Sequence, residues 1–154
     1  MSTFRAQTTW TRTRDDFSYD HYDRDHEVRW GSGQAAAASA APEYLGSADR
    51  LNPEEALVGA LSSCHMLTFL AIAARKRLVV DAYSDAAEGV LGKNDAGKLA
   101  ITEVTLRPVV RFAPGVAVDP AALARMHEAA HANCFIAQTV KASVRILAPE
   151  ADGG

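Results

Sequence analysis

A run of nineteen residues without a charged side chain, from Ala56 to Ala74, constrains the fold of this chain more than any other feature. Asn52, Pro53 and Glu55 precede it at the positions that suit a helix N-cap, the first helical residue and a capping-box acid. The predicted helix is apolar on almost every side, so it has to be covered by the rest of the protein, by a partner or by lipid. Its centre reads Ser-Ser-Cys-His over residues 62–65, which favours a buried central helix over a membrane span.

Composition places the chain among ordinary globular proteins. Its 154 residues are 48% hydrophobic and 23% charged, which suits a single domain over residues 1–154. The net charge of −3 gives no electrostatic reason to expect nucleic acid. The first ten residues contain no apolar segment of the signal-peptide kind, so we expect a cytoplasmic protein. In that compartment two cysteines are reduced, catalytic or metal-bound more often than they form a structural disulfide.

The remaining periodicities predict an α+β domain in the order β, β, α, β, β, α, β. Residues 31–50 have little periodicity and are predicted to be a loop, and residues 149–154 a frayed tail. The turn-forming linker 92–97 predicts that its two flanking strands form an antiparallel hairpin. The predicted strands cover residues 4–10, 19–30, 79–91, 99–112 and 139–147, and the second helix runs from Asp119 and Pro120 to about Asn133.

The chain has two cysteines, Cys64 and Cys134, each in apolar sequence. They are consistent with a two-cysteine redox site, with a metal site, or with two inert core thiols. Cys64 lies about eleven residues inside its helix, where the dipole of the helix N-terminus no longer helps a thiolate. A reactive Cys64 therefore requires a cation from elsewhere, and Arg24, Arg50 and the histidines are the candidates.

Three histidines stand close to the cysteines in sequence. His65 follows Cys64, while His127 and His131 precede Cys134 at helical spacing. Cys64, His65, His131 and Cys134 offer two sulfurs and two nitrogens, the donor set of a zinc site. Adjacent helical residues point about 100° apart, which weakens this alternative, so no metal is predicted. We interpret His127 and His131 as surface or partner-facing residues, and His65 as a core residue with a satisfied ring nitrogen.

Three segments have a distinctive sequence: residues 52–66, which contain NPEEAL and ALSSCHM, residues 99–104 (LAITEV) and residues 132–141 (ANCFIAQTVK). Together they resemble the OsmC/Ohr family of organic hydroperoxide reductases. The resemblance covers roughly residues 50–147. It implies an OsmC-like α+β fold, with antiparallel sheets wrapped around two long central helices in an intertwined homodimer.

The resemblance also implies a thiol-dependent peroxidase. Cys64 would attack the peroxide and become a sulfenic acid, and Cys134 would condense with it to a Cys64–Cys134 disulfide. An external dithiol, for example a lipoyl-type dithiol, would reduce that disulfide, and no cofactor is expected. In the family an arginine stabilises the thiolate and pairs with a glutamate at the start of the cysteine helix. The glutamate corresponds to Glu54; the arginine corresponds to Arg24, in the segment DRDH, with Arg50 as the alternative.

Helix geometry adds to the expectation of a homodimer. Ten residues of helix rise about 15 Å, so Glu54 cannot touch Cys64 of its own helix. It would serve the site through a long arginine or from a partner helix. Met66, Phe69 and Phe135 are candidates to line an apolar pocket for an organic hydroperoxide. The alternative is a catalytically silent OsmC-like binding module for a small apolar ligand. Neither nucleic acid nor a membrane is an expected partner.

Overall fold

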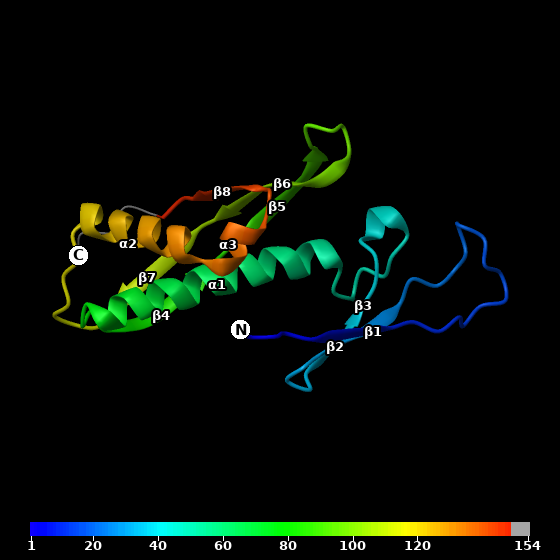
Figure 1. The fold of residues 1–154 in the computed structure, drawn as a ribbon, viewed down its shortest axis with the longest axis horizontal. Coiled ribbons are helices and arrows are strands. Elements are labelled where there is room, and N and C mark those ends of the chain that lie inside the picture. The colour runs from blue at the N-terminus through cyan, green and yellow to red at the C-terminus, as the bar shows by residue number, and fades with distance from the viewer. Residues whose placement is uncertain (149–154) are drawn as a thin grey trace. The chain divides into compact units, whose positions relative to one another are not determined.

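The computed structural model describes residues 1–148, so the predicted frayed tail at residues 149–154 lies outside the described part. The chain forms two compact units, residues 1–56 and residues 57 onward, called the first and second units below. The helix α1 (Pro53–Arg75) begins in the first unit and continues through the second (Figure 1). That residues 1–154 make one domain stays a prediction.

The first unit is built on a three-stranded antiparallel sheet in the order β1-β2-β3. The strands are β1 (Ala6–Thr9), β2 (His26–Trp30) and β3 (Ala35–Ala38), followed by the short 3-10 helix η1 (Pro42–Tyr44). β1 and β2 lie within the predicted strands at residues 4–10 and 19–30, and they pair in antiparallel fashion. The prediction of a loop over residues 31–50 was wrong, because β3 pairs with β2 through four consecutive alanines. Such a run has neither alternation nor strand propensity to reveal it.

Both ends of α1 are capped by hydrogen bonds to backbone groups that have no partner within the helix. The backbone N–H of Glu55 donates to Asn52 Oδ1 at 2.8 Å, which confirms the predicted N-cap. At the other end Arg77 adopts a left-handed conformation with φ 59°. The amides of Arg77 and Leu78 donate to the carbonyls of Ala74 and Ala73, both at 3.0 Å. This is a Schellman motif, which usually has glycine where this chain has Arg77.

The hairpin predicted from the linker at residues 92–97 is present, but each of its two long strands is broken in two. The turn is built on Asn94, whose side chain accepts the amides of Ala96 and Lys98. At the break, the backbone N–H of Arg107 donates to Asp85 Oδ1 at 2.6 Å. The four strands are β4 (Val80–Asp85), β5 (Glu88–Lys93), β6 (Leu99–Leu106) and β7 (Pro108–Phe112), with β4 antiparallel to β7 and β5 antiparallel to β6.

The last part of the chain contains α2 (Pro120–Asn133), the short helix α3 (Phe135–Thr139) and β8 (Ser143–Ile146). The predicted strand over residues 139–147 therefore begins four residues late, because α3 occupies its expected start. Cys134 caps α3, since the backbone N–H of Ala137 lies 3.4 Å from Cys134 Sγ. β8 pairs with β6 in parallel, so the sheets are not antiparallel throughout.

The core of the second unit follows one face of α1. Leu61, His65, Phe69 and Ala73 recur every four residues and are all buried. In the second unit α2 lies alongside α1 and runs in the opposite direction (Figure 1). Among the described residues, α1 is long and apolar enough to cross a membrane, a test that the core helix of a soluble protein also passes. The intertwined homodimer with two central helices stays a prediction.

Candidate active site

The second unit brings the two cysteines together. Cys64, midway along α1, packs beside Cys134, which links α2 to α3, in a cluster with Leu61, Val104 and Leu106. Both thiols are free, Cys134 is fully buried, and Cys64 is half-buried. One thiol of the pair is thus accessible and the other is protected, although seventy residues separate them in the sequence.

The environment of Cys134 keeps it protonated at neutral pH. Burial, together with the adjacent Cys64 thiol, raises the pKa of Cys134 to about 11, and the hydrogen bond from the Ala137 amide offsets this only in part. Because a thiolate is the nucleophilic form, Cys134 is the less suitable of the two to attack a substrate first. As a buried thiol beside Cys64, it is well placed to react with an oxidised Cys64.

Cys64 faces a cavity of about 710 Å³ between α1 and the start of α3. Its walls are mostly apolar and include Leu67 and Phe135, whose residues are 60% and 83% exposed. Arg75 supplies a cation to the wall, but it lies eleven residues beyond Cys64, about 16 Å along the helix. Of the three predicted lining residues, Phe135 lines this cavity, whereas Phe69 belongs to the core and the cavity does not include Met66.

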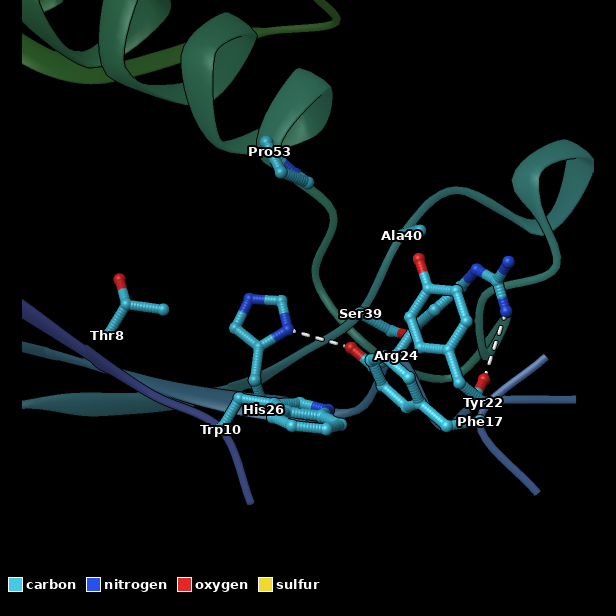
Figure 2. A pocket seen from close by; sticks show the side chains of 9 residues that line it. All are labelled: Thr8, Trp10, Phe17, Tyr22, Arg24, His26, Ser39, Ala40 and Pro53. Carbon is cyan, nitrogen blue, oxygen red and sulfur yellow. Dashed lines mark hydrogen bonds between the residues drawn. The ribbon is translucent and has the colours of Figure 1, made fainter. Parts of the chain in front are cut away.

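Arg24 is buried in the first unit and is engaged there by two tyrosines. Its guanidinium donates to the carbonyls of Tyr19 at 2.7 Å and Tyr22 at 3.0 Å, and lies 3.9 Å from the centre of the Tyr22 ring. Arg24 and Tyr22 line an aromatic pocket of about 400 Å³ that also includes Trp10 and Phe17. Figure 2 shows the Tyr22 ring standing beside the Arg24 side chain in this pocket.

The other two predicted charged residues also lie in the first unit. Arg50 Nε forms an ion pair with Asp25 Oδ2 at 2.9 Å, and Ser47 donates to the second oxygen of that carboxylate at 2.7 Å. Glu54 is half-buried in the first turn of α1, where the helix dipole favours an acid. Both candidate arginines thus have partners within their own unit. The catalytic roles of Arg24, Arg50 and Glu54 stay predictions.

The prediction that His127 is a surface or partner-facing residue was wrong, since only 3% of it is exposed within its own chain. Its Nδ1 forms a hydrogen bond of 3.1 Å with Nε2 of His65, which is 1% exposed. Burial lowers the pKa of each histidine to about 4, so both are neutral at pH 7. His65 therefore supplies no positive charge to the adjacent Cys64. Sequence reasoning missed this pair because its formation depends on how α1 and α2 are aligned.

The zinc alternative finds no support in the side-chain geometry. Within residues 1–148, no three His, Cys, Asp or Glu side chains are arranged to hold a metal ion. One ring nitrogen of His65 is taken by His127, which is not part of the proposed set of two cysteines and two histidines.

A comparison with known protein families shows to which family this chain belongs. The family of OsmC-like proteins matches residues 46–147. The chain belongs to the OsmC-like protein family. This confirms the resemblance found in the sequence and the α+β OsmC-like fold. A comparison with curated proteins found no match.

Solved structures of other proteins share this fold. An OsmC-like protein of unknown function from Vibrio cholerae is 42% identical, with a TM-score of 0.91 over 97% of this chain and 100% of that chain. An organic hydroperoxide resistance protein from Elizabethkingia anophelis is 16% identical, with a TM-score of 0.75 over 97% of both chains. The organic hydroperoxide resistance protein OhrB of Bacillus subtilis is 15% identical, with a TM-score of 0.70 over 96% of this chain and 98% of that chain. The two low-identity neighbours show a common fold alone.

Proposed function

We propose that this OsmC-like protein is a thiol-dependent peroxidase that reduces organic hydroperoxides. The observation that carries the proposal is the thiol pair: an accessible Cys64 facing an apolar cavity, with a buried, protonated Cys134 beside it. An apolar cavity suits the carbon chain of an organic hydroperoxide better than it suits hydrogen peroxide. Its family and the names of its structural neighbours agree with this chemistry.

The chemistry requires no cofactor. The Cys64 thiolate attacks the terminal oxygen of ROOH, the O–O bond breaks, and one proton is taken up to give Cys64 sulfenic acid and ROH. The Cys134 sulfur then attacks the sulfenic sulfur, forming the Cys64–Cys134 disulfide; the thiol proton leaves with the hydroxyl group as water. An external dithiol, such as a lipoyl-type dithiol, reduces the disulfide and is itself oxidised to a cyclic disulfide.

A cation near Cys64 is the remaining requirement, and we assign it to Arg24, paired with Glu54. The two carbonyl bonds of Arg24 use only part of its five-donor guanidinium group, which leaves donors for a thiolate or a carboxylate. Arg50 is the less suitable of the two arginines, because its charge is already matched by Asp25.

We also propose that the active form is a cytoplasmic homodimer. Only 22% of the most apolar 18-residue window of α1 is buried within the chain, and Leu67 and Phe135 are exposed beside Cys64. Covering such a surface with a second copy removes apolar area from water at about 25 cal/mol per Å². Sedimentation equilibrium at micromolar concentration tests this proposal, and a monomer there would contradict it.

Intact-mass measurement tests the peroxidase. One equivalent of cumene hydroperoxide is added to the reduced wild type and to the Cys134→Ser variant. The wild type should lose about 2 Da as the disulfide forms, and the variant should gain about 16 Da as the sulfenic acid accumulates. Cys64→Ser serves as the matched control and should not change. An unchanged wild-type mass after several minutes would refute the proposal.

The alternative of a catalytically silent binding module is supported by the engaged state of Arg24, which already has two carbonyl partners and a tyrosine face. If Arg24 never reaches a thiolate, Cys64 will behave as an ordinary thiol. The pH dependence of Cys64 alkylation in Cys134→Ser separates the two functions. A midpoint well below about 8.5 favours the peroxidase, and a midpoint at or above that value favours the binding module.

A further inference from the structure

The hydrogen bond between His65 and His127 joins the two helices that carry the thiols. Its two nitrogens are 3.1 Å apart, the ring centroids are 5.4 Å apart and the ring planes differ by 7°, so the two rings are nearly parallel and meet through their nitrogens rather than face to face. The face of His127 also packs on Phe69, with ring centroids 4.5 Å apart. Both histidines are nearly inaccessible to solvent. The pair therefore has one defined geometry, fixed by an aromatic neighbour.

The position of the pair relates it directly to the cysteines. His65 immediately follows Cys64 on α1, and His127 lies seven residues, or two helical turns, before Cys134 at the end of α2. α1 and α2 lie side by side and run in opposite directions (Figure 1). This helix pair contains the contact between the two histidines, and the residue at the end of α2, Cys134, makes the contact with Cys64. A shift of α1 along α2 would move both contacts together.

The core around the pair is close-packed, but its contacts are not directional. It contains Ala73, Leu123, Met126 and Ala130. A hydrogen bond adds a directional requirement to this packing, because it weakens steeply as its distance and angle change. A disulfide is equally demanding, since its two Cβ atoms have to be about 3.5–4.5 Å apart.

We propose that His65 and His127 are positioning residues that align Cys64 with Cys134 for disulfide formation. The proposal rests on the thiol pair of the proposed function, but not on reaction with a peroxide. Breaking the hydrogen bond should lower the equilibrium constant for Cys64–Cys134 disulfide formation, because the thiols would have to be realigned before they could be joined. The hydrogen bond itself, rather than a titratable imidazole, is the required element.

Amide side chains allow this to be tested without histidine. The Nε2 of His65 is replaced by the amide of glutamine and the Nδ1 of His127 by the amide of asparagine, so His65→Gln/His127→Asn can rebuild the bond. The comparison variant is His65→Gln/His127→Leu, because leucine is close to asparagine in size and cannot form the bond. Leu123→Val is the packing control, since it reduces the volume of the same core and leaves the histidines in place.

Equilibration with dithiothreitol at several ratios of its reduced and oxidised forms measures the equilibrium constant for Cys64–Cys134 disulfide formation. In this exchange the two protein thiols give two electrons and two protons to oxidised dithiothreitol. We expect the equilibrium constant of the Gln/Asn variant to match that of the wild type within about threefold. We expect the constant of the Gln/Leu variant to be about tenfold lower than that of the wild type. We expect Leu123→Val to lose thermal stability and to keep the wild-type constant.

Three outcomes would overturn the proposal. The equilibrium constant for disulfide formation could be equal in the Gln/Asn and Gln/Leu variants, it could fall tenfold in the Gln/Asn variant, or it could fall by a similar factor in Leu123→Val. If the Gln/Leu variant does not fold, the Gln/Asn variant and Leu123→Val decide the question. A wild type that forms the disulfide with oxidised dithiothreitol but not with cumene hydroperoxide would refute the peroxidase and leave this proposal standing.

Discussion

Acidification from pH 7 to about 4.5 should destabilise the fold through His65 and His127. Burial lowers the pKa of each from 6.5 to about 4, although the charge of Asp85 opposes the shift. The unfolded chain therefore binds more protons than the folded chain between pH 6.5 and about pH 4. Stability is fully present above pH 6.5 and is lost as the pH falls toward 4.

The size of the effect follows from the same values. A tenfold change in proton affinity corresponds to about 1.4 kcal/mol, so each histidine contributes roughly 2 kcal/mol between pH 7 and pH 4.5. The two together cost roughly 4 kcal/mol. Domains of this kind are stable by about 5–15 kcal/mol in total. The loss would therefore be a large part of the stability of this chain.

Urea denaturation followed by circular dichroism at pH 7, 6, 5 and 4.5 measures the loss. The His65→Gln/His127→Asn variant is the control, because it keeps the pair's hydrogen bond and removes both titrating groups. Its stability should fall by roughly 4 kcal/mol less than that of the wild type over this range. Parallel losses in the two proteins would refute the argument, because the acid sensitivity would then come from other groups, carboxylates above all.

Substitutions at three further positions test local backbone geometry by their effect on the urea midpoint. Arg77→Gly should stabilise the chain by roughly 0.5–1 kcal/mol, because φ 59° strains a residue with a Cβ; a lower midpoint would contradict this. Gly46→Ala should cost roughly 2–3 kcal/mol, since its Cβ would lie 1.7 Å from the Ala40 carbonyl oxygen, and a wild-type midpoint would show that the loop can relax. Asn52→Ala should cost about 1 kcal/mol by removing the cap on the Glu55 amide, while Asn52→Asp should retain most of it.

The elements that could be predicted from the sequence are those with local signals. The start of α1 was predicted because a capping residue, a proline and acids precede the apolar run. The turn of the hairpin was predicted because Asn94 and Gly97 are turn residues, and Gly97 has φ +72°. β3 and α3 were missed because neither has a periodic signal: one is four alanines, and the other is a five-residue helix capped by a cysteine sulfur.

The site, too, could be predicted from the sequence only where the residues have a recognisable signal. The pairing of Cys64 with Cys134 came from the family resemblance, and the second unit confirms that they lie together. The pairing of His65 with His127 had no signal in the sequence, because it depends on the alignment of α1 along α2. Helical spacing predicted correctly that His65 points away from Cys64, but it could not show what His65 meets on the other side.

The adjacent residues Cys64 and His65 point about 100° apart on α1, and this separates two properties of the site. His65 belongs to the buried face, with Leu61 and Phe69, where it forms its hydrogen bond with His127 of α2. Cys64 lies at the edge of that face and opens onto the cavity lined by Leu67. Under the proposed function, substitution of Leu67 should therefore change how a peroxide reaches Cys64 without moving Cys134. Loss of the His65 hydrogen bond should instead change how Cys64 meets Cys134.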